Sequence, residues 1–265
     1  RAMLRAPPGT ARKPRPGGLL ARFDAALPFE LTAGQRAVGD VLLTELADSA
    51  PMHRLLQGEV GSGKTLVALR AMLAVVDAGG QAALLAPTEV LAQQHDRSLR
   101  QLLGPLAQAG ELGAADDATR VALLTGSLGA AARRSALAQA ASGEAGLVVG
   151  THALLGEHVA FADLGLVVVD EQHRFGVEQR DALRGKGVAP HVLVMTATPI
   201  PRTVAMTVYG DLEVSTLTEL PVGRSPIRSA VVAVAEHPGW LDRAWQRVRE
   251  AVGQGRQAFV VCPRI

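Results

Sequence analysis

Gly58–Thr65, with the sequence G-E-V-G-S-G-K-T, matches the pattern G-x-x-x-x-G-K-[ST] at every required position. The run His53–Gln57 predicts a strand entering this stretch, and Leu66–Leu73 predicts a helix leaving it. Between a strand and a helix, glycine-rich backbone and the helix N-terminus can surround phosphate oxygens with N–H groups. We therefore expect a nucleoside triphosphate to be bound by Gly58, Glu59, Val60, Gly61, Ser62, Gly63, Lys64 and Thr65.

Lys64 and Thr65 have the side chains that phosphate chemistry needs. A lysine at this position places a cation on the outer phosphates, and a threonine hydroxyl can ligate Mg²⁺. The alternative is a glycine-rich turn that binds nothing. Composition argues against it, because only Lys13, Lys64 and Lys186 are lysines among 27 basic residues. A chain that uses arginine nearly everywhere keeps lysine where a compact point charge suits phosphate.

The overall composition predicts a globular cytoplasmic protein. Of 265 residues, 48% are hydrophobic, which is enough for a buried core. Cys262 is the single cysteine, so internal disulfides and a cysteine-based zinc site are excluded. No apolar stretch reaches membrane-spanning length and no signal peptide is visible, so we expect no membrane contact.

Residues 1–27 have the composition of a linker, rich in Pro, Gly and Arg. We expect a solvated, partly disordered tail here, with contact to nucleic-acid phosphates as the alternative. The chain starts without methionine and ends at Ile265 directly after an apolar run. We therefore expect it to be a fragment of a longer protein.

Predicted strands and helices alternate between residues 28 and 218. The expected strands after the first are near-continuous aliphatic runs at 81–86, 121–124, 146–149, 164–169 and 191–195. Such runs are typical of a parallel sheet covered on both faces, so we expect a doubly wound α/β domain with ligands at the carboxyl ends of its strands. After a linker at 219–226, residues 227–265 are expected to begin a second, truncated domain, with strands at 227–234 and 258–262.

Four polar residues, Asp170-Glu171-Gln172-His173, follow the run Val167–Val169 directly. A solvated loop after a strand is one explanation. In the functional explanation, Asp170 binds Mg²⁺ through the water shell of the ion. Asp170 is expected on the strand next to the phosphate loop, Gly58–Thr65. Glu171 would deprotonate the attacking water. Gln172 and His173 would sense the γ-phosphate, and we count His173 among the catalytic candidates.

Thr196 and Thr198 flank Ala197 at the end of the predicted strand 191–195. Their hydroxyls are expected to hydrogen-bond His173 or Asp170 and so couple the nucleotide state to the rest of the domain. Other small hydroxyl residues follow strands and start helices, where they could bind a nucleic-acid backbone without reading bases. These candidates for nucleic-acid contact are Thr88, Thr125, Ser127 and Thr151, for which simple helix capping is the alternative.

Gln35 precedes the phosphate loop within Leu31–Gln35. A glutamine amide can pair with both the N6 donor and the N7 acceptor of adenine, which would select ATP over GTP. Phe29 could stack on the same base. A surface glutamine without this role is the alternative.

In this order, the motifs resemble those of superfamily-two helicases and translocases. Within that superfamily, D-E-Q-H-R-F-G-V-E-Q-R (Asp170–Arg180), T-A-T-P-I-P-R-T (Thr196–Thr203) and G-T-H-A-L (Gly150–Leu154) closely resemble the RecG family of bacterial branched-DNA helicases. The resemblance runs from about Leu27 to Ile265. It implies a RecA-like P-loop NTPase domain at 28–218 and the start of a second RecA-like domain at 227–265.

The resemblance also implies an activity. We expect ATP-dependent, Mg²⁺-dependent translocation on double-stranded DNA at stalled forks and Holliday junctions, in DNA repair and recombination. Arg202 would couple the T-A-T-P motif to the DNA track, or else lie on a surface helix. The implied partners are branched DNA and single-stranded DNA-binding protein, for a monomer associated with the nucleoid. Arginine fingers normally come from the second motor domain, so we expect this chain alone to hydrolyse ATP slowly or not at all.

The sequence leaves four alternative functions open. The transcription-repair coupling factor shares R-F-G-V and T-A-T-P-I-P-R-T, although its acidic motif usually ends differently from Gln172-His173. A nucleotide-gated clamp would bind DNA without moving along it and would not need Glu171. A small-molecule kinase or a GTPase is a third option, but no guanine-reading Asn-Lys-x-Asp stretch is present. An RNA helicase is the fourth, because phosphate contacts distinguish RNA from DNA poorly.

Overall fold

The computed structural model describes residues 9–111, 113–115, 117–170, 189–197, 212–219 and 229–262. The chain divides into two compact units, residues 1–222 and 223–265. The boundary between the units falls inside the segment 219–226. Within the described ranges, no helix is both long and apolar enough to span a membrane.

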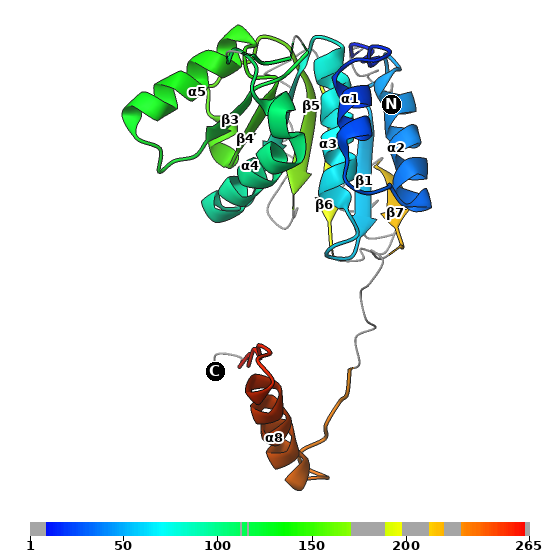
Figure 1. Ribbon diagram of the computed structural model, residues 1–265, viewed down its shortest axis with the longest axis vertical. Helices are drawn as coiled ribbons and strands as arrows, with labels where there is room; N and C mark the ends of the chain where they lie inside the picture. Colours follow the sequence, from blue (N-terminus) through cyan, green and yellow to red (C-terminus); the bar gives the residue numbers. More distant parts are fainter. Residues whose placement is uncertain are drawn as a thin grey trace, which may run out of the picture. The chain divides into compact units, whose positions relative to one another are not determined.

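A parallel sheet of seven strands is the frame of the described part of the first unit (Figure 1). The strands lie in the order β3-β4-β2-β5-β6-β1-β7, and all neighbours run parallel. The prediction of a doubly wound parallel α/β domain is therefore confirmed. The strands are β1 (His53–Gly58), β2 (Gln81–Leu85), β3 (Val121–Leu124), β4 (Leu147–Gly150), β5 (Leu164–Asp170), β6 (His191–Thr196) and β7 (Glu213–Leu217).

Helices cover both faces of this sheet. The described helices are α1 (Leu19–Ala26), α2 (Ala33–Leu46), α3 (Lys64–Asp77), α4 (Glu89–Leu103) and α5 (Ala130–Ser142), with short 3₁₀ helices η1 (Gly104–Ala107) and η2 (His152–Leu155). Residues of α1 to α4 pack in one apolar cluster, and residues of α5 pack in a second cluster. Successive strand residues point to opposite faces, so Leu56 belongs to the first cluster and Leu55 to the second.

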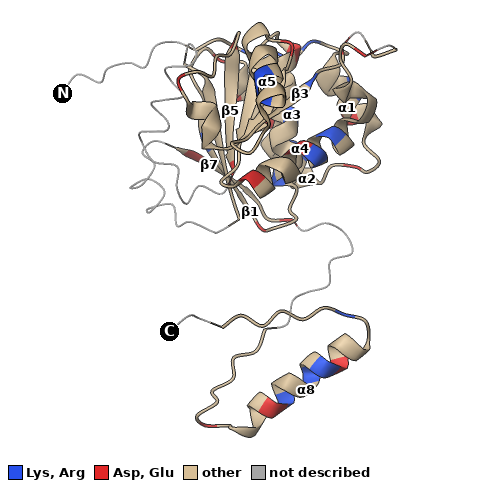
Figure 2. Cartoon of the chain, turned by 90° about the vertical axis from the view of Figure 1, so that its left-hand side faces the viewer, with Lys and Arg blue, Asp and Glu red and all other residues tan. Residues whose placement is uncertain are grey.

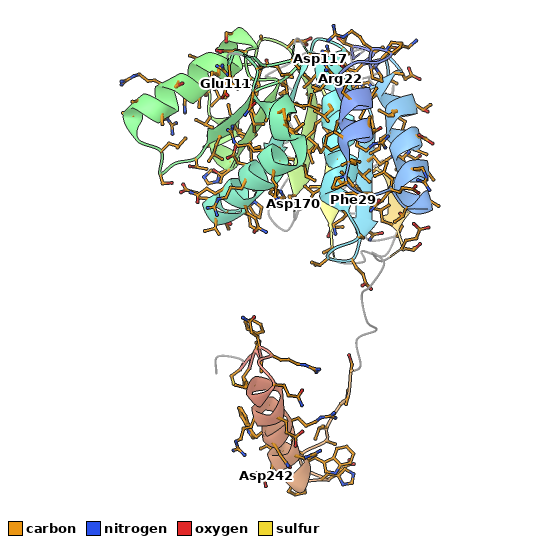
Figure 3. All side chains as sticks on the ribbon, in the orientation of Figure 1. Arg22, Phe29, Glu111, Asp117, Asp170 and Asp242 are labelled. Carbon is orange, nitrogen blue, oxygen red and sulfur yellow. The ribbon has the colours of Figure 1, made fainter. Side chains whose placement is uncertain are left out.

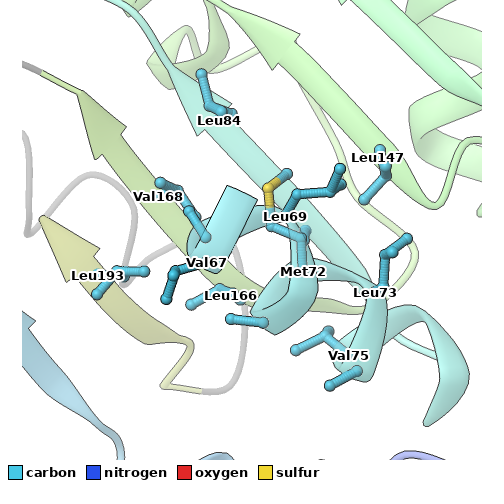
Figure 4. Packing of buried hydrophobic residues seen from close by; sticks show 14 of the residues in the cluster. Val67, Leu69, Met72, Leu73, Val75, Leu84, Leu147, Leu166, Val168 and Leu193 are labelled. Atoms are coloured by element: carbon cyan, nitrogen blue, oxygen red, sulfur yellow. The ribbon is translucent and has the colours of Figure 1, made fainter. Parts of the chain in front are cut away.

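Helix α3, which follows the phosphate loop, is the most deeply buried helix of the described chain. Figure 4 shows its Val67, Leu69 and Met72 packed among strand residues of the sheet, including Leu84 and Val168. All five side chains are completely buried. A helix that is apolar on nearly every side requires such a position. This packing fixes the start of α3, and with it Lys64, relative to the strand ends.

Residues 9–26 correct the prediction of a solvated tail at 1–27. Leu19 and Phe23 of α1 are each 1% exposed and join the apolar cluster that covers α3. The backbone N–H groups of Leu19 and Leu20 donate to the Asp77 carboxylate at 2.7 and 3.0 Å. Arg12 is buried and forms a bidentate pair with Asp163. The composition of this segment resembles a linker, but Asp77 and Asp163 lie 57 to 151 positions further along the chain.

His191, the first residue of β6, connects the same N-terminal segment to the sheet. Its Nδ1 accepts from the Met52 backbone N–H at 3.0 Å, so Nε2 carries the proton and donates to the Thr10 carbonyl at 3.3 Å. Burial lowers the pKa of His191 below its usual value of 6.5. A proton added to Nδ1 would also break the bond from Met52.

This histidine predicts acid-sensitive stability. Because its pKa is lower in the folded than in the unfolded chain, its contribution is complete above pH 6.5 and declines as the pH falls below that value. The expected slope is at most about 1.4 kcal/mol per pH unit, the limit for one proton. Urea unfolding at pH 7.5 and 5.5 measures it, with exposed His158→Gln as the matched control. A His191→Gln variant with the same pH dependence as the unaltered chain would contradict the assignment.

The second unit contains one described helix, α8 (Gly239–Gly253), which carries charges of both signs (Figure 2). Arg243 and Glu250 form an ion pair at 3.1 Å, and the His237 ring stacks on Trp240. The described residues of the expected strands at 227–234 and 258–262 are not strands. A strand forms by pairing with a neighbour, and the described residues of this unit contain no such neighbour.

Candidate functional site

The phosphate loop leaves β1 at Gly58 and turns into α3 at Lys64. Gly61 and Gly63 both have φ values of +87°, in the left-handed region that favours glycine. At Gly63 a side chain is excluded for a second reason, because a Cβ atom would lie 2.3 Å from Nε2 of Gln35. The two glycines therefore allow the sharp turn that points backbone N–H groups into the loop.

Lys64 lies over this loop. Its Nζ donates to the carbonyl oxygens of Gly58 at 2.6 Å and of Glu59 at 3.0 Å. The ammonium is thus held at the mouth of the turn by neutral acceptors of the loop itself. In the part of the chain that the structure describes, the buried Ser62 Oγ has no hydrogen-bond partner. The loop thus offers a cation and a hydroxyl where a phosphate would add acceptor oxygens.

Asp170 ends β5, and its position corrects one prediction. We expected it on the strand next to the phosphate loop, but β6 lies between β5 and β1. The strand register still places Asp170 near the end of β1, where the phosphate loop starts. Asp170 pairs with Met195, which pairs with Leu56, two residues before Gly58. Figure 3 shows Asp170 at the edge of the domain where β5 ends. In a doubly wound sheet, the central strands share this ligand-binding edge.

One pocket of about 380 Å³ joins the phosphate loop to Asp170. It lies among the carboxyl ends of β1, β5 and β6, the start of α3, and α4. The residues that line it are Val60, Gly61, Gly63, Lys64, Thr65, Leu91, Gln94, His95, Asp170 and Ala197. The structure therefore brings Lys64, Thr65 and Asp170 together in one pocket, and their roles toward nucleotide and Mg²⁺ stay predictions.

The donor set of this pocket fits Mg²⁺ bound together with a nucleotide. Thr65 supplies a hydroxyl and Asp170 a carboxylate, both hard oxygen ligands. Among the described residues no three or more His, Cys, Asp or Glu side chains form a metal-binding cluster. A magnesium site that takes one or two protein oxygens and completes its shell with phosphate and water does not need such a cluster.

Sequence reasoning missed Leu91, Gln94 and His95 of this pocket, and His95 is the one that contacts Asp170. It lies on α4, and its Nε2 is 2.6 Å from Oδ2 of Asp170. A histidine inside a helix gives no local signal of such a role. The available signal was spacing, since His95 follows buried Ala92 by three residues and precedes buried Leu99 by four. It therefore lies on the buried side of α4, where a polar side chain needs a partner.

Gln35 and Phe29 do not line this pocket. Oε1 of Gln35 accepts from the Thr32 backbone N–H at 3.0 Å, and Nε2 donates to the Ser62 carbonyl at 2.9 Å. The amide thus closes a capping box on α2 and holds the phosphate loop. Phe29 is 49% exposed and borders a separate pocket of about 570 Å³ with Arg36 and Arg70. Adenine contact by these two residues stays a prediction.

The DNA-contact candidates all have local hydrogen-bond roles. The Thr88 hydroxyl caps α4 by accepting from the Leu91 N–H at 3.3 Å, and Thr151 caps η2. Thr125 is 1% exposed, and its hydroxyl lies 3.5 Å from that of Ser127. Helix capping, the alternative we raised, is therefore present at Thr88 and Thr151, and it does not exclude a second contact to phosphate.

The loop Thr125–Ser127 already holds an anion from its own chain. The Ser127 N–H donates to Oε1 of Glu89 at 3.1 Å. Hydrogen bonds from the Ser127 hydroxyl and from the backbone N–H groups of Ser127 and Gly126 hold the pKa of Glu89 below its usual 4.5. A loop that stabilises a carboxylate in this way has the polarity needed for a phosphate.

Five predicted site residues lie outside the described residues. They are Glu171, Gln172, His173, Thr198 and Arg202. Thr196 is described, and it ends β6 as a buried residue. The roles given to these residues therefore stay predictions.

The model of the DEAD/DEAH box helicase family matches residues 32–207. ATP-dependent DNA helicase RecG of Mycobacterium tuberculosis (strain ATCC 25618 / H37Rv) is 66% identical over 251 residues, which are 94% of this chain and 34% of that protein. RecG of Synechocystis sp. is 50% identical over 94% of this chain and 28% of that protein. The chain thus spans about a third of the length of the curated relatives it matches.

Solved structures of helicases also superpose on this chain. One described as "Structure of RecG bound to three-way DNA junction" superposes with a TM-score of 0.77 at 37% identity, over 97% of this chain and 32% of the other. The helicase domain of Pyrococcus furiosus Hef superposes with a TM-score of 0.53 at 22% identity, over 83% of this chain and 47% of the other. The second likeness concerns the fold alone, whereas the first extends to sequence.

Proposed function

Because the chain belongs to the DEAD/DEAH box helicase family, we propose that it is the ATP-binding motor part of a translocase acting on branched double-stranded DNA. The observation that carries the proposal is the pocket that joins the phosphate loop to Asp170. The names of the relatives support the same activity, since they describe RecG as an ATP-dependent DNA helicase. A solved RecG structure contains a three-way DNA junction, which supports branched DNA as the substrate.

Within this proposal each residue of the pocket has one task. The backbone N–H groups of the phosphate loop and the N-terminus of α3 hold the β- and γ-phosphates. Lys64 exchanges its bonds to the Gly58 and Glu59 carbonyls for phosphate oxygens. The Thr65 hydroxyl and the Asp170 carboxylate hold Mg²⁺, which when bound neutralises charge on the phosphates. Glu171 follows Asp170 directly and would deprotonate the attacking water.

DNA binding is proposed along the carboxyl ends of three other strands of the same sheet. Thr88, Ser127 and Thr151 follow β2, β3 and β4, which lie next to one another in the sheet. The bond between Ser127 and Glu89 supports this proposal, because the Ser127 N–H is oriented to donate to an anionic oxygen. Contacts of this kind follow the backbone, so binding would be independent of base sequence and sensitive to salt. Adenine selection by Gln35 and Phe29, coupling through Gln172, Thr196, Thr198 and Arg202, and association with single-stranded DNA-binding protein are further parts of the proposal.

The experiment that tests this function is ATP turnover with and without forked DNA, for this chain and for the longer parent protein that we expect. Fork-stimulated turnover in the parent and little turnover in this chain are expected, because the arginine fingers of this superfamily act from the second motor domain. Such fingers are worth roughly 10³- to 10⁵-fold in rate. Equal stimulated turnover by both proteins would mean that the active site is complete within this chain.

Glu171→Gln in the parent separates a motor from a nucleotide-gated clamp. A motor needs a base for the water, so fork remodelling should fall with ATP turnover while nucleotide binding persists. A clamp needs Lys64 and Asp170 but not this base. Fork remodelling that survives Glu171→Gln would therefore reject translocation and leave the clamp.

A further inference from the structure

His95 and Asp170 form a contact that the proposed reaction does not yet use. Their atoms Nε2 and Oδ2 are 2.6 Å apart, and the two side chains are 12% and 14% exposed. They come from α4 and from the end of β5, 75 positions apart in the sequence. Both also line the pocket of the phosphate loop. The contact therefore lies within the nucleotide site and not behind it.

The direction of this hydrogen bond follows from the chemistry of the two groups. A carboxylate oxygen only accepts, so Nε2 of His95 must carry the hydrogen and donate it. Hydrogen bonds to an ionised acceptor are short and about twice as strong as neutral ones. One oxygen of Asp170 is thus held by protein, and the carboxylate cannot rotate without losing that bond.

The helix that carries His95 is itself fixed. Ala92 and Leu99 lie on the same side of α4 and are completely buried in the first apolar cluster, which contains residues of α1 to α4. Thr88 caps the start of this helix, and the first helical residue, Glu89, accepts a hydrogen bond from the Ser127 backbone N–H. The imidazole therefore extends from a rigid support towards Asp170.

We propose that His95 is a positioning residue for Asp170, orienting the carboxylate so that its other oxygen faces the water shell of nucleotide-bound Mg²⁺. This inference rests on the proposed function, in which Asp170 serves Mg²⁺. Outer hydrogen-bond partners of this kind orient metal-binding carboxylates, and their loss typically costs 10- to 100-fold in metal affinity. His95 acts through Asp170 and touches neither the phosphates nor the attacking water.

The experiment measures the affinity of the chain for a fluorescent ADP derivative over a series of Mg²⁺ concentrations and in EDTA. His95→Ala should raise the Mg²⁺ concentration needed for half of the magnesium-dependent gain in affinity by about 10-fold. The affinity in EDTA should stay unchanged, because the phosphate loop is intact. A merely structural role for His95 would lower both affinities or neither.

Two amide variants form a matched pair. In His95→Gln the side-chain amide N–H reaches the position of Nε2, whereas in His95→Asn it falls short. Gln should therefore retain most of the Mg²⁺ response and Asn should lose it, which keeps the test decisive even if His95→Ala fails to fold. Exposed His158→Ala serves as the control for removal of a histidine elsewhere in the domain.

Asp170→Asn separates failure of this inference from failure of the proposed function. If Asp170→Asn leaves the Mg²⁺ response unchanged, the magnesium role of Asp170 is wrong. If Asp170→Asn removes the response and His95→Ala and His95→Asn keep it, only the positioning role of His95 is overturned. If His95→Ala has no additional effect in the Asp170→Asn background, the two residues act as one unit, as proposed. Independent, additive effects would overturn the proposal.

Discussion

Lys64→Ala is expected to lower fork-stimulated ATP turnover of the parent protein by roughly 100- to 1,000-fold, the cost of losing one preorganised charge partner of the transition state. The ammonium lies at the mouth of the phosphate loop on the Gly58 and Glu59 carbonyls, and among the described residues that line this pocket Lys64 is the one lysine or arginine. Its removal should leave the fold intact, because α3 is held by the buried core and not by Lys64.

Lys13→Ala is the matched control for Lys64→Ala. Lys13 is the other described lysine and is exposed to solvent. Turnover and nucleotide affinity should be unchanged in this variant, and urea unfolding of both variants should give midpoints close to that of the unaltered protein. A Lys64→Ala protein that keeps more than about a tenth of the turnover would contradict phosphate binding by this loop.

Asp77→Ala is expected to destabilise the first unit by roughly 2–4 kcal/mol, because two backbone N–H groups lose their acceptor. Asp77 ends α3, its side chain is completely buried, and its carboxylate accepts from the N–H groups of Leu19 and Leu20. These bonds hold the first turn of α1 against α3. Without the Asp77 carboxylate, either α1 moves away from α3 or the N–H groups of Leu19 and Leu20 stay buried without this acceptor.

Two further variants make this stability measurement specific. Asp77→Asn keeps one side-chain oxygen that can accept, so its loss should lie between that of Asp77→Ala and zero. Asp40→Ala removes an exposed carboxylate from α2 and should cost less than about 0.5 kcal/mol. Urea midpoints at constant m-value provide the comparison. Equal midpoints for Asp77→Ala and Asp40→Ala would mean that α1 does not depend on Asp77.

Much of the nucleotide site could be predicted because its parts are local. The eight residues Gly58–Thr65 contain the turn, the cation and the hydroxyl in one continuous stretch, and the flanking runs predict β1 and α3. The aliphatic runs likewise predict buried strands, since only a parallel sheet with helices on both faces buries them. Asp170 was placed correctly at a strand end, although not on the neighbouring strand, because strand order is not encoded in any single run.

The sequence by itself determined the class of fold, the glycine-rich turn between β1 and α3, and the position of Asp170 at a strand end. Only the tertiary structure decided that residues 9–26 pack on the core, that the Gln35 amide holds the Ser62 carbonyl, and that His95 reaches Asp170. The physical reason is separation along the chain. Periodicity and glycine positions act within a few residues, whereas these contacts join groups 27 to 181 positions apart and exist only once helix and sheet have packed.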